Sequence, residues 1–124
     1  MATPILNITE VADGQIDQFL VYNQALRDLE AATNAILPLD LSAANRSITS
    51  TEFTRNYIFV TTGNAVSRTL SFPSQIRNFV VRNAGSAVLI AAVGTTQINV
   101  PVGRSRMFYS DGTTNGLVLL DFTT

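Results

Sequence analysis

The sequence predicts a mainly β protein, with a short N-terminal arm and helix followed by an antiparallel β-sandwich or barrel. Two observations lead to this fold class. Residues 14–37 have the apolar spacing of a helix, and seven short β-prone runs follow them. The 124 residues suit one domain with a modest core. We expect the arm and helix in residues 1–38, a linker or edge segment in residues 39–54, and the β-domain in residues 55–124.

The helix is predicted from apolar residues that recur at alternating steps of three and four. On one continuous helix they form a narrow stripe of Phe19, Tyr22, Leu26, Leu29, Thr33 and Ile36. Residues 19–22 are also β-prone and Asn23 is a good N-cap, so only residues 24–35 are expected to be helical in either case. Pro38 disfavours the α conformation in the residue before it, so the helix should end by about Ile36.

A helix of this length is not stable alone in water, so its apolar stripe must pack on another surface. The narrow stripe is typical of a seam between helices. If Leu26 and Leu29 are buried in that way, Leu29→Ala should cost about 2–5 kcal/mol. Arg27 lies off the stripe, so Arg27→Ala should cost far less.

Weaker signals lie on both sides of this helix. Residues 4–10 alternate in a way that fits a short strand or an extended arm, and Asp13-Gly14 predicts a turn. Residues 39–54 are rich in Ser, Thr, Asn and Ala, which predicts a linker or a loosely packed edge.

The β-domain is predicted from short runs separated by turn residues such as Gly63-Asn64 and Asp111-Gly112. The seven runs are residues 56–62, 66–72, 75–82, 87–93, 97–102, 105–109 and 116–122. Residues 75–82 and 116–122 are apolar on both faces. We therefore expect both to be central strands, covered on their two faces by a second sheet or a neighbouring subunit.

Composition excludes several kinds of chemistry. The chain has no Cys, His or Trp, and all eight basic residues are Arg. A Ser-His-Asp triad, a Cys-His pair, an imidazole metal site and a P-loop lysine are therefore excluded. A net charge of −1 argues against an electrostatic nucleic-acid binder. No apolar run reaches the length of a membrane span and the start has no signal-peptide pattern, so we expect no membrane partner and a cytosol-like compartment.

The remaining polar clusters favour structural roles. Asp28 and Glu30 are two apart on a helix and do not face each other. Asp13 and Asp17 suit a helix start. Residues 111–116 lack the ligand spacing of a calcium loop and predict a hairpin loop. We expect no catalytic residue, cofactor or metal site, and the chain is not expected to be an enzyme.

Arg104 and Arg106 could share one face of a strand beside residues 107–109, which include two aromatics. Stacking on single-stranded nucleic acid is one reading of such a pattern. Ion pairing with Asp111 or Asp121, across a sheet or a subunit boundary, is the favoured one.

Two stretches resemble a known group of proteins. Gly14-Gln15 and residues 21–30, VYNQALRDLE, resemble the GQ … VT-x-NEALR-x-LD pattern near the start of small virion proteins of tailed bacteriophages and related gene transfer agents. Residues 98–113, INVPVGRSRMFYSDGT, resemble the V-x-V-P-x-G-R-T-x-x-x-x-S-D-G-T hairpin of phage fibre, spike and decoration proteins. The chain departs from these patterns at Gln24, where Glu is usual, and at Ser105, where Thr is usual.

The resemblance implies a homotrimeric virion structural protein, with the helix near the threefold axis and the β-domain displayed outward. A low charge fraction of 14% is also consistent with apolar surface shared between copies. We expect the oligomer seam at Phe19, Tyr22, Leu26, Leu29 and Ile36. We expect attachment to the particle at Ile5, Leu6 and Ile8, because a β-prone arm can add to a sheet edge.

The size of the chain favours a capsid decoration or cement protein, or a short head fibre, in a virion assembled in the host bacterial cytoplasm. Its expected partners are other copies of itself and the major capsid protein or another virion protein. A tail-fibre adaptor or tip protein is the alternative. A carbohydrate-binding module is a third reading, for which only Tyr22, Tyr57 and Tyr109 offer a phenol and Trp is absent.

Overall fold

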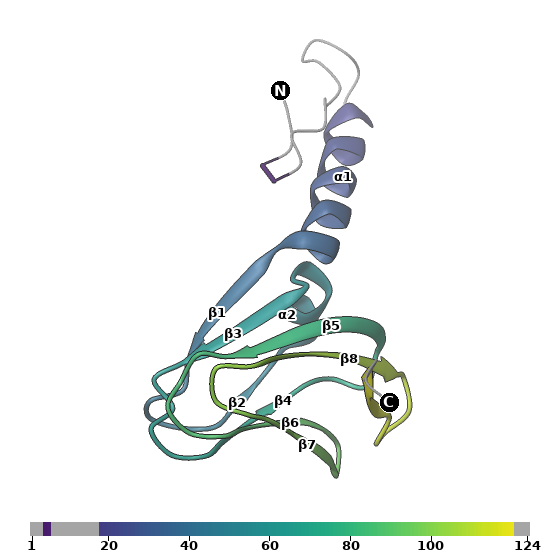
Figure 1. Cartoon of the computed structure of the whole chain (residues 1–124). Helices are drawn as coiled ribbons and strands as arrows, with labels where there is room; N and C mark the ends of the chain where they lie inside the picture. The colour runs from purple at the N-terminus through teal and green to yellow at the C-terminus, as the bar shows by residue number, and fades with distance from the viewer. Residues whose placement is uncertain (1–3, 6–17, 121–124) are drawn as a thin grey trace.

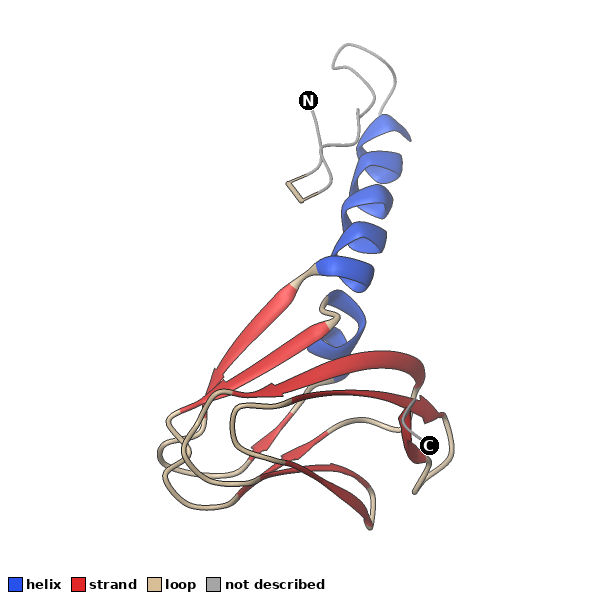
Figure 2. Ribbon diagram, in the orientation of Figure 1, coloured by secondary structure: helices blue, strands red, loops and turns tan. Residues whose placement is uncertain are grey.

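The computed structural model describes residues 4–5 and 18–120, and for residues 18–22 the backbone alone. The described chain is mainly β, with a long helix that projects from two sheets (Figures 1 and 2). Its elements in chain order are α1 (Gln18–Asn34), β1 (Ile36–Asp40), β2 (Arg46–Ser47), α2 (Ser50–Arg55), β3 (Ile58–Thr62), β4 (Arg68–Ser71), β5 (Ile76–Asn83), β6 (Leu89–Val93), β7 (Thr96–Val100), β8 (Ser105–Asp111) and β9 (Leu117–Leu120).

The predicted helix is present as α1, and all seven predicted β-prone runs contain a strand. Since α1 begins at Gln18, the β-prone residues 19–22 are helical, and the longer of the two predicted helices is the observed one. The helix ends at Asn34, and Pro38 lies inside β1 at the edge of a sheet. Proline is tolerated there because an edge strand can lack a donor.

The strands form two mixed sheets that do not close into a barrel. One has the order β1-β3-β5-β8-β9 and the other the order β2-β4-β6-β7. The prediction of a wholly antiparallel domain is wrong. The pairs β1-β3, β3-β5, β2-β4 and β4-β6 are parallel, and only the later pairs are antiparallel.

The parallel pairs arise because successive strands alternate between the two sheets. The turn at Gly63-Asn64 joins β3 to β4 in the opposite sheet, where a hairpin would have reversed the chain within one sheet. Ile36 pairs with Ile58 and Ile58 with Val80, so equivalent positions in the first sheet recur every 22 residues. The chain thus winds as a short coil, which the hairpins β6-β7 and β8-β9 complete.

Of the two strands predicted to be central, one is. β5 is the middle strand of the five-stranded sheet, whereas β9 is an edge strand. The reason is that apolar residues on both faces report what lies above and below a strand and say nothing about its lateral neighbours. Residues 39–54, expected as a linker or edge segment, contain the edge strand β2, α2 and the end of the edge strand β1.

This edge segment also packs into the core more tightly than its composition suggests. Leu39, Leu41, Ile48 and Phe53 are all buried. Phe53 of α2 lies 5.1 Å, between ring centroids, from Phe79 of the central strand, in an edge-to-face arrangement. The rest of the aromatic core consists of Phe59, Phe72 and Phe108. Facing aliphatic residues of the second sheet, including Leu70, Leu89 and Val100, complete it.

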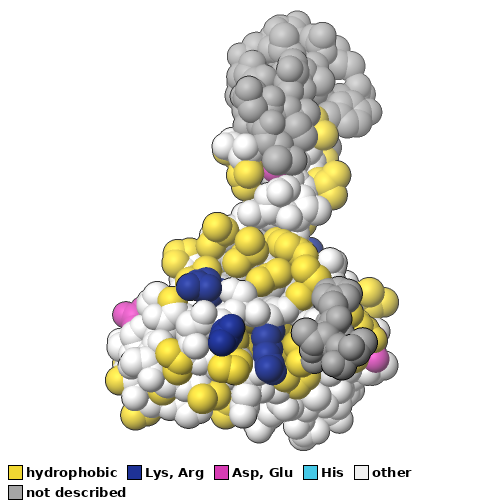
Figure 3. All heavy atoms as spheres, in the orientation of Figure 1, with side chains coloured by type: hydrophobic (Ala, Val, Ile, Leu, Met, Phe, Trp, Pro, Cys, Tyr) yellow, Lys and Arg dark blue, Asp and Glu magenta, His cyan; other side chains and the backbone are white. Residues whose placement is uncertain are grey.

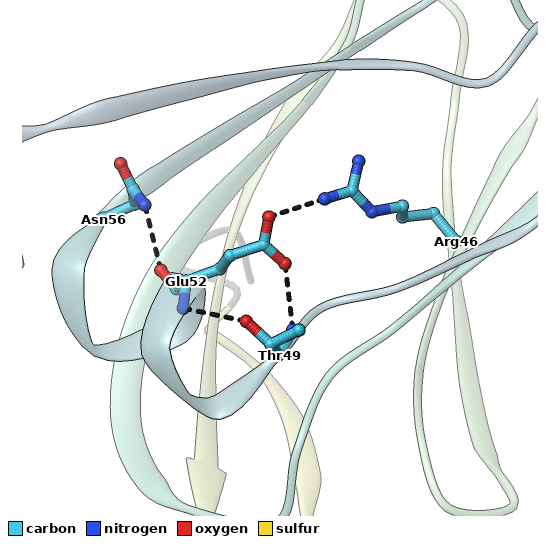
Figure 4. Close-up of polar contacts among 4 residues, drawn as sticks. All are labelled: Arg46, Thr49, Glu52 and Asn56. Atoms are coloured by element: carbon cyan, nitrogen blue, oxygen red, sulfur yellow. Dashed lines mark hydrogen bonds and ion pairs between the residues drawn. The ribbon is translucent and has the colours of Figure 1, made fainter.

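α2 is held by a capping box that directs Phe53 into this core. The Thr49 hydroxyl accepts from the Glu52 backbone N–H at 3.1 Å, and the Glu52 carboxylate accepts from the Thr49 N–H at 3.0 Å (Figure 4). The second oxygen of Glu52 pairs with Arg46 at 2.5 Å. Asn56 donates to the Glu52 carbonyl at 3.0 Å. A six-residue helix is thereby fixed at both ends.

Two buried asparagines hold the turns that cross between the sheets. Asn83 donates to the carbonyls of Ala87 and Val100, and Asn64 donates to Ala87 and to the Asn83 side chain. Gly85 lies against this pair, because a Cβ there would be 1.8 Å from Asn64 Oδ1. Successive turns of the coil are therefore tied by side-chain amides as well as by the sheet ladders.

Candidate assembly surface

α1 is joined to the β-domain by Arg77 of β5. Its guanidinium donates to the carbonyl of Ala32, in the last turn of α1, and at 2.8 Å to the carbonyl of Asn56, just after α2. Its Cζ also lies 5.9 Å from the centroid of the Phe53 ring. Burial lowers the pKa of Arg77, although a guanidinium remains protonated. A positive charge at the negative end of a helix is favourable, so this contact helps to hold the end of α1 against the β-domain.

Among the side chains of α1 that the structure describes, the two that are fully buried are polar. Asn23 and Glu30 are buried, Glu30 to 2% exposure. The Glu30 carboxylate accepts from the backbone N–H of Ile5 at 2.7 Å, which ties the start of the chain to the helix. Ile5 itself is exposed, and Leu6 and Ile8, the other predicted attachment residues, lie outside the described part of the chain.

Two of the three predicted seam residues whose side chains the structure describes are exposed in the single chain. Leu29 is 64% exposed, Ile36 is 59% exposed and Leu26 is half-buried. Phe19 and Tyr22 lie in α1, where their side chains are outside the described part of the structure. Ile36 is the first residue of β1 and no longer helical, so it stands at the junction between the helix and the sheet. Leu29 and Ile36 are therefore available to a partner.

A second set of apolar residues lies on the outer face of the five-stranded sheet and includes Ile36. The ladder pairs Ile36, Ile58, Val80, Met107 and Leu120 side by side across all five strands. Their neighbours along β3 and β5, Phe59 and Val81, point into the core, so alternation puts this row on the outside. Each member of the row is at least partly exposed.

Further apolar residues lie beside this row on the same face. They are Pro38, Val60, Ile76, Tyr109 and Val118, with Ile76 84% exposed. Figure 3 shows hydrophobic side chains gathered on the β-domain where it meets α1, with arginine side chains beside them. A contiguous apolar face of this kind is typical of an interaction surface.

Charged residues stand at the margins of the apolar face. Arg82 is exposed and donates to the Ser105 hydroxyl at 3.3 Å. Asp40 and Asp111 are exposed at the last positions of β1 and β8, which lie at opposite ends of the sheet. Hydrogen bonds from Ser42 lower the pKa of Asp40, and those from Thr113 lower the pKa of Asp111.

The polar clusters weighed from the sequence do not assemble into a reactive site among the described residues. Asp28 contacts Gln24 and Arg55, whereas Glu30 contacts Ile5. Asp13 and Asp17 lie outside the described residues. No group of three or more Asp or Glu residues in the described ranges is placed to hold a metal ion. In the same ranges, no helix has the length and apolar character to cross a membrane.

Arg104, Arg106 and the predicted loop at residues 111–116 are all within the described part of the chain. Arg106 donates to the Asn99 carbonyl at 2.9 Å, whereas Asp121, one of the two carboxylates expected to pair with the arginines, lies outside the described residues. Arg104 lies in the exposed turn before β8. Residues 111–116 form the predicted hairpin loop, closed by the Asp111 carboxylate, which accepts from the Thr113 N–H and hydroxyl.

Sequence reasoning found the helical stripe but missed the outer row of the sheet and the Arg77 contact. The signal for the row was present, since Ile36, Ile58 and Val80 repeat at a spacing of 22 residues, as do Arg55-Asn56 and Arg77-Asn78. The Arg77 contact had no comparable signal, because it depends on the position of a carbonyl 45 residues away.

Comparison of the chain with protein-family models, curated proteins and solved structures finds no match. Its function therefore has to be inferred from its own residues and their arrangement.

Proposed function

We propose that this chain is a homotrimeric structural protein of a phage virion, a capsid decoration or cement protein or a short head fibre. The observation that carries the proposal is the set of exposed apolar residues, Leu29 on α1 and the row that begins at Ile36 on the outer face of the five-stranded sheet. Such a surface suits assembly with other copies.

The shape of the chain supports a division of labour. α1 projects from the sheets (Figure 1), and the Glu30 contact ties the start of the arm to that helix. α1, with Ile5 held against it, therefore forms one end of the molecule, suited to attachment, and the β-domain forms the other, suited to display. The resemblance of residues 21–30 and 98–113 to phage virion proteins favours a particle as the partner.

Removal of residues 2–12 tests the proposal. The deletion takes away Ile5, Leu6 and Ile8 but none of the residues of the β-domain core. We expect a chain that folds, by circular dichroism and thermal melting, and that no longer binds particles. A control variant replaces residues 2–12 with a Gly/Ser segment of equal length, because loss of binding there shows that the arm's side chains are needed.

Electron microscopy of particles that carry the labelled full-length chain locates it. Many copies over the head support decoration. Density confined to the tail would replace this function with that of a tail-fibre adaptor or tip. A full-length chain that binds no virion component would refute the proposal as a whole.

A further inference from the structure

We infer that a second copy of this chain packs on the outer face of the five-stranded sheet and on the Leu29 side of α1 together. This inference rests on the homotrimer of the proposed function and assigns the surface through which it forms. It is carried by the apolar row Ile36, Ile58, Val80, Met107 and Leu120, which spans the whole sheet.

The helix and the sheet row come together at Ile36. Leu29 and Thr33 are four residues apart on one side of α1, and both are exposed. Ile36 lies two residues beyond the end of α1, is exposed, and is the first member of the sheet row. A partner that covers this end of the row therefore lies close to the end of α1.

The area needed by a stable interface indicates that both parts are used. Five strands about 4.8 Å apart, with four residue steps of about 3.3 Å, give the sheet face on the order of 250 Å². In a threefold ring each copy's face is shared between two neighbours, so the sheet alone would bury about 250 Å² in total at each contact, well below the roughly 1,000 Å² expected of a biological interface. One side of α1, about 25 Å long and about 10 Å wide, adds a similar area and doubles the surface buried at each contact.

Charge indicates that the occupant is another copy. The face carries both signs, with Arg82 on β5 and Asp40 on β1, on the same side of the sheet. A head-to-tail contact around a threefold axis brings one edge of the face to the middle of the next, so Arg82 of one copy can meet Asp40 of another. A partner with a face of one sign only would leave one of these charges opposed or unpaired.

A charge placed in the centre of the row tests the surface. Val80→Glu puts a carboxylate on the outer face, while its neighbour Val81 still fills the core. The wild-type chain is expected to run in light scattering at roughly three times 13.4 kDa, and the variant at 13.4 kDa with unchanged circular dichroism. Gln97→Glu adds the same charge on the exposed side of β7, in the other sheet, and should leave the trimer intact.

A disulfide trap tests the arrangement of the copies, because the chain has no cysteine of its own. Asp40 and Arg82 lie two strands apart on one face, roughly 10 Å, which exceeds the reach of a disulfide within one chain. Asp40→Cys with Arg82→Cys in the same chain should give covalent dimers and trimers on mild oxidation. Each single variant should give far fewer.

The outcomes separate the two ideas. A wild-type trimer that Val80→Glu leaves intact overturns the inferred surface and leaves the proposed function standing. A wild-type chain that is monomeric both free and on the particle overturns the trimer itself. A folded monomer of Val80→Glu, together with covalent trimers of the double cysteine variant, establishes the surface and its head-to-tail order.

Discussion

Replacement of Arg77 by methionine tests whether one guanidinium joins the helix to the β-domain. Methionine keeps an unbranched, apolar stem but removes both hydrogen bonds, to the carbonyls of Ala32 and Asn56. A hydrogen bond from a charged donor contributes about 1.5–3 kcal/mol, and partial exposure of the site reduces that figure. We expect the free energy of unfolding to fall by about 2–4 kcal/mol.

Urea unfolding followed by circular dichroism measures this change, with helical and sheet signals recorded separately. The matched control is Arg104→Met, since Arg104 is exposed in the turn before β8 and should tolerate the change within about 0.5 kcal/mol. Equal losses for the two variants would show that the Arg77 contacts contribute nothing specific. A loss in the Arg77 variant with the helical signal unaltered in the folded state would show that α1 is held by other contacts.

Two further predictions concern the helix stripe and acid stability. Because Leu29 is 64% exposed, Leu29→Ala should lower the free energy of unfolding by at most about 1 kcal/mol in a monomer, but by about 2–5 kcal/mol in a trimer that buries Leu29. Leu70→Ala, at a fully buried position, is the reference for a large loss. Equal losses of stability for Leu29→Ala at low and high protein concentration would contradict burial by a second copy. The pKa of Asp111 is lowered from its ordinary value of 3.8, so this carboxylate contributes stability at pH values above 3.8, and the contribution is lost as the pH falls below 3.8. Thr113→Val should move the pKa of Asp111, measured by NMR, upward toward 3.8. An unchanged pKa would refute the role of Thr113.

The sequence predicted those features that depend on local patterns. The stripe on α1, the strand in each of the seven β-prone runs and the hairpin loop after Asp111 follow from residue spacing and turn chemistry. The direction of pairing did not follow, because a turn such as Gly63-Asn64 has the same chemistry whether the chain reverses within a sheet or crosses to another.

The sequence predicted that the helix stripe packs on another surface, but periodicity alone could not say whether that surface belongs to the same chain. Apolar spacing shows which residues share a side of a helix, but the protein's own elements need not cover that side. Here Glu30 and Asn23 are buried and Leu29 is exposed. The capping box Thr49 to Glu52 was readable as a helix start within residues 39–54, yet a six-residue helix has too little apolar periodicity to stand out.

The winding of the chain has a consequence for how this protein could change in length. In a coil, each turn contacts mainly the turns before and after it, so its stability approximates a sum of neighbour terms. The 22-residue spacing of Ile36, Ile58 and Val80 defines one such unit. Duplication of one unit, such as residues 58–79 with Phe59 and Asn64, would add a strand to each sheet and leave the pairing of the existing strands in register. The antiparallel strands β7, β8 and β9 would still close one end, so growth is open only from the side of β1 and β2.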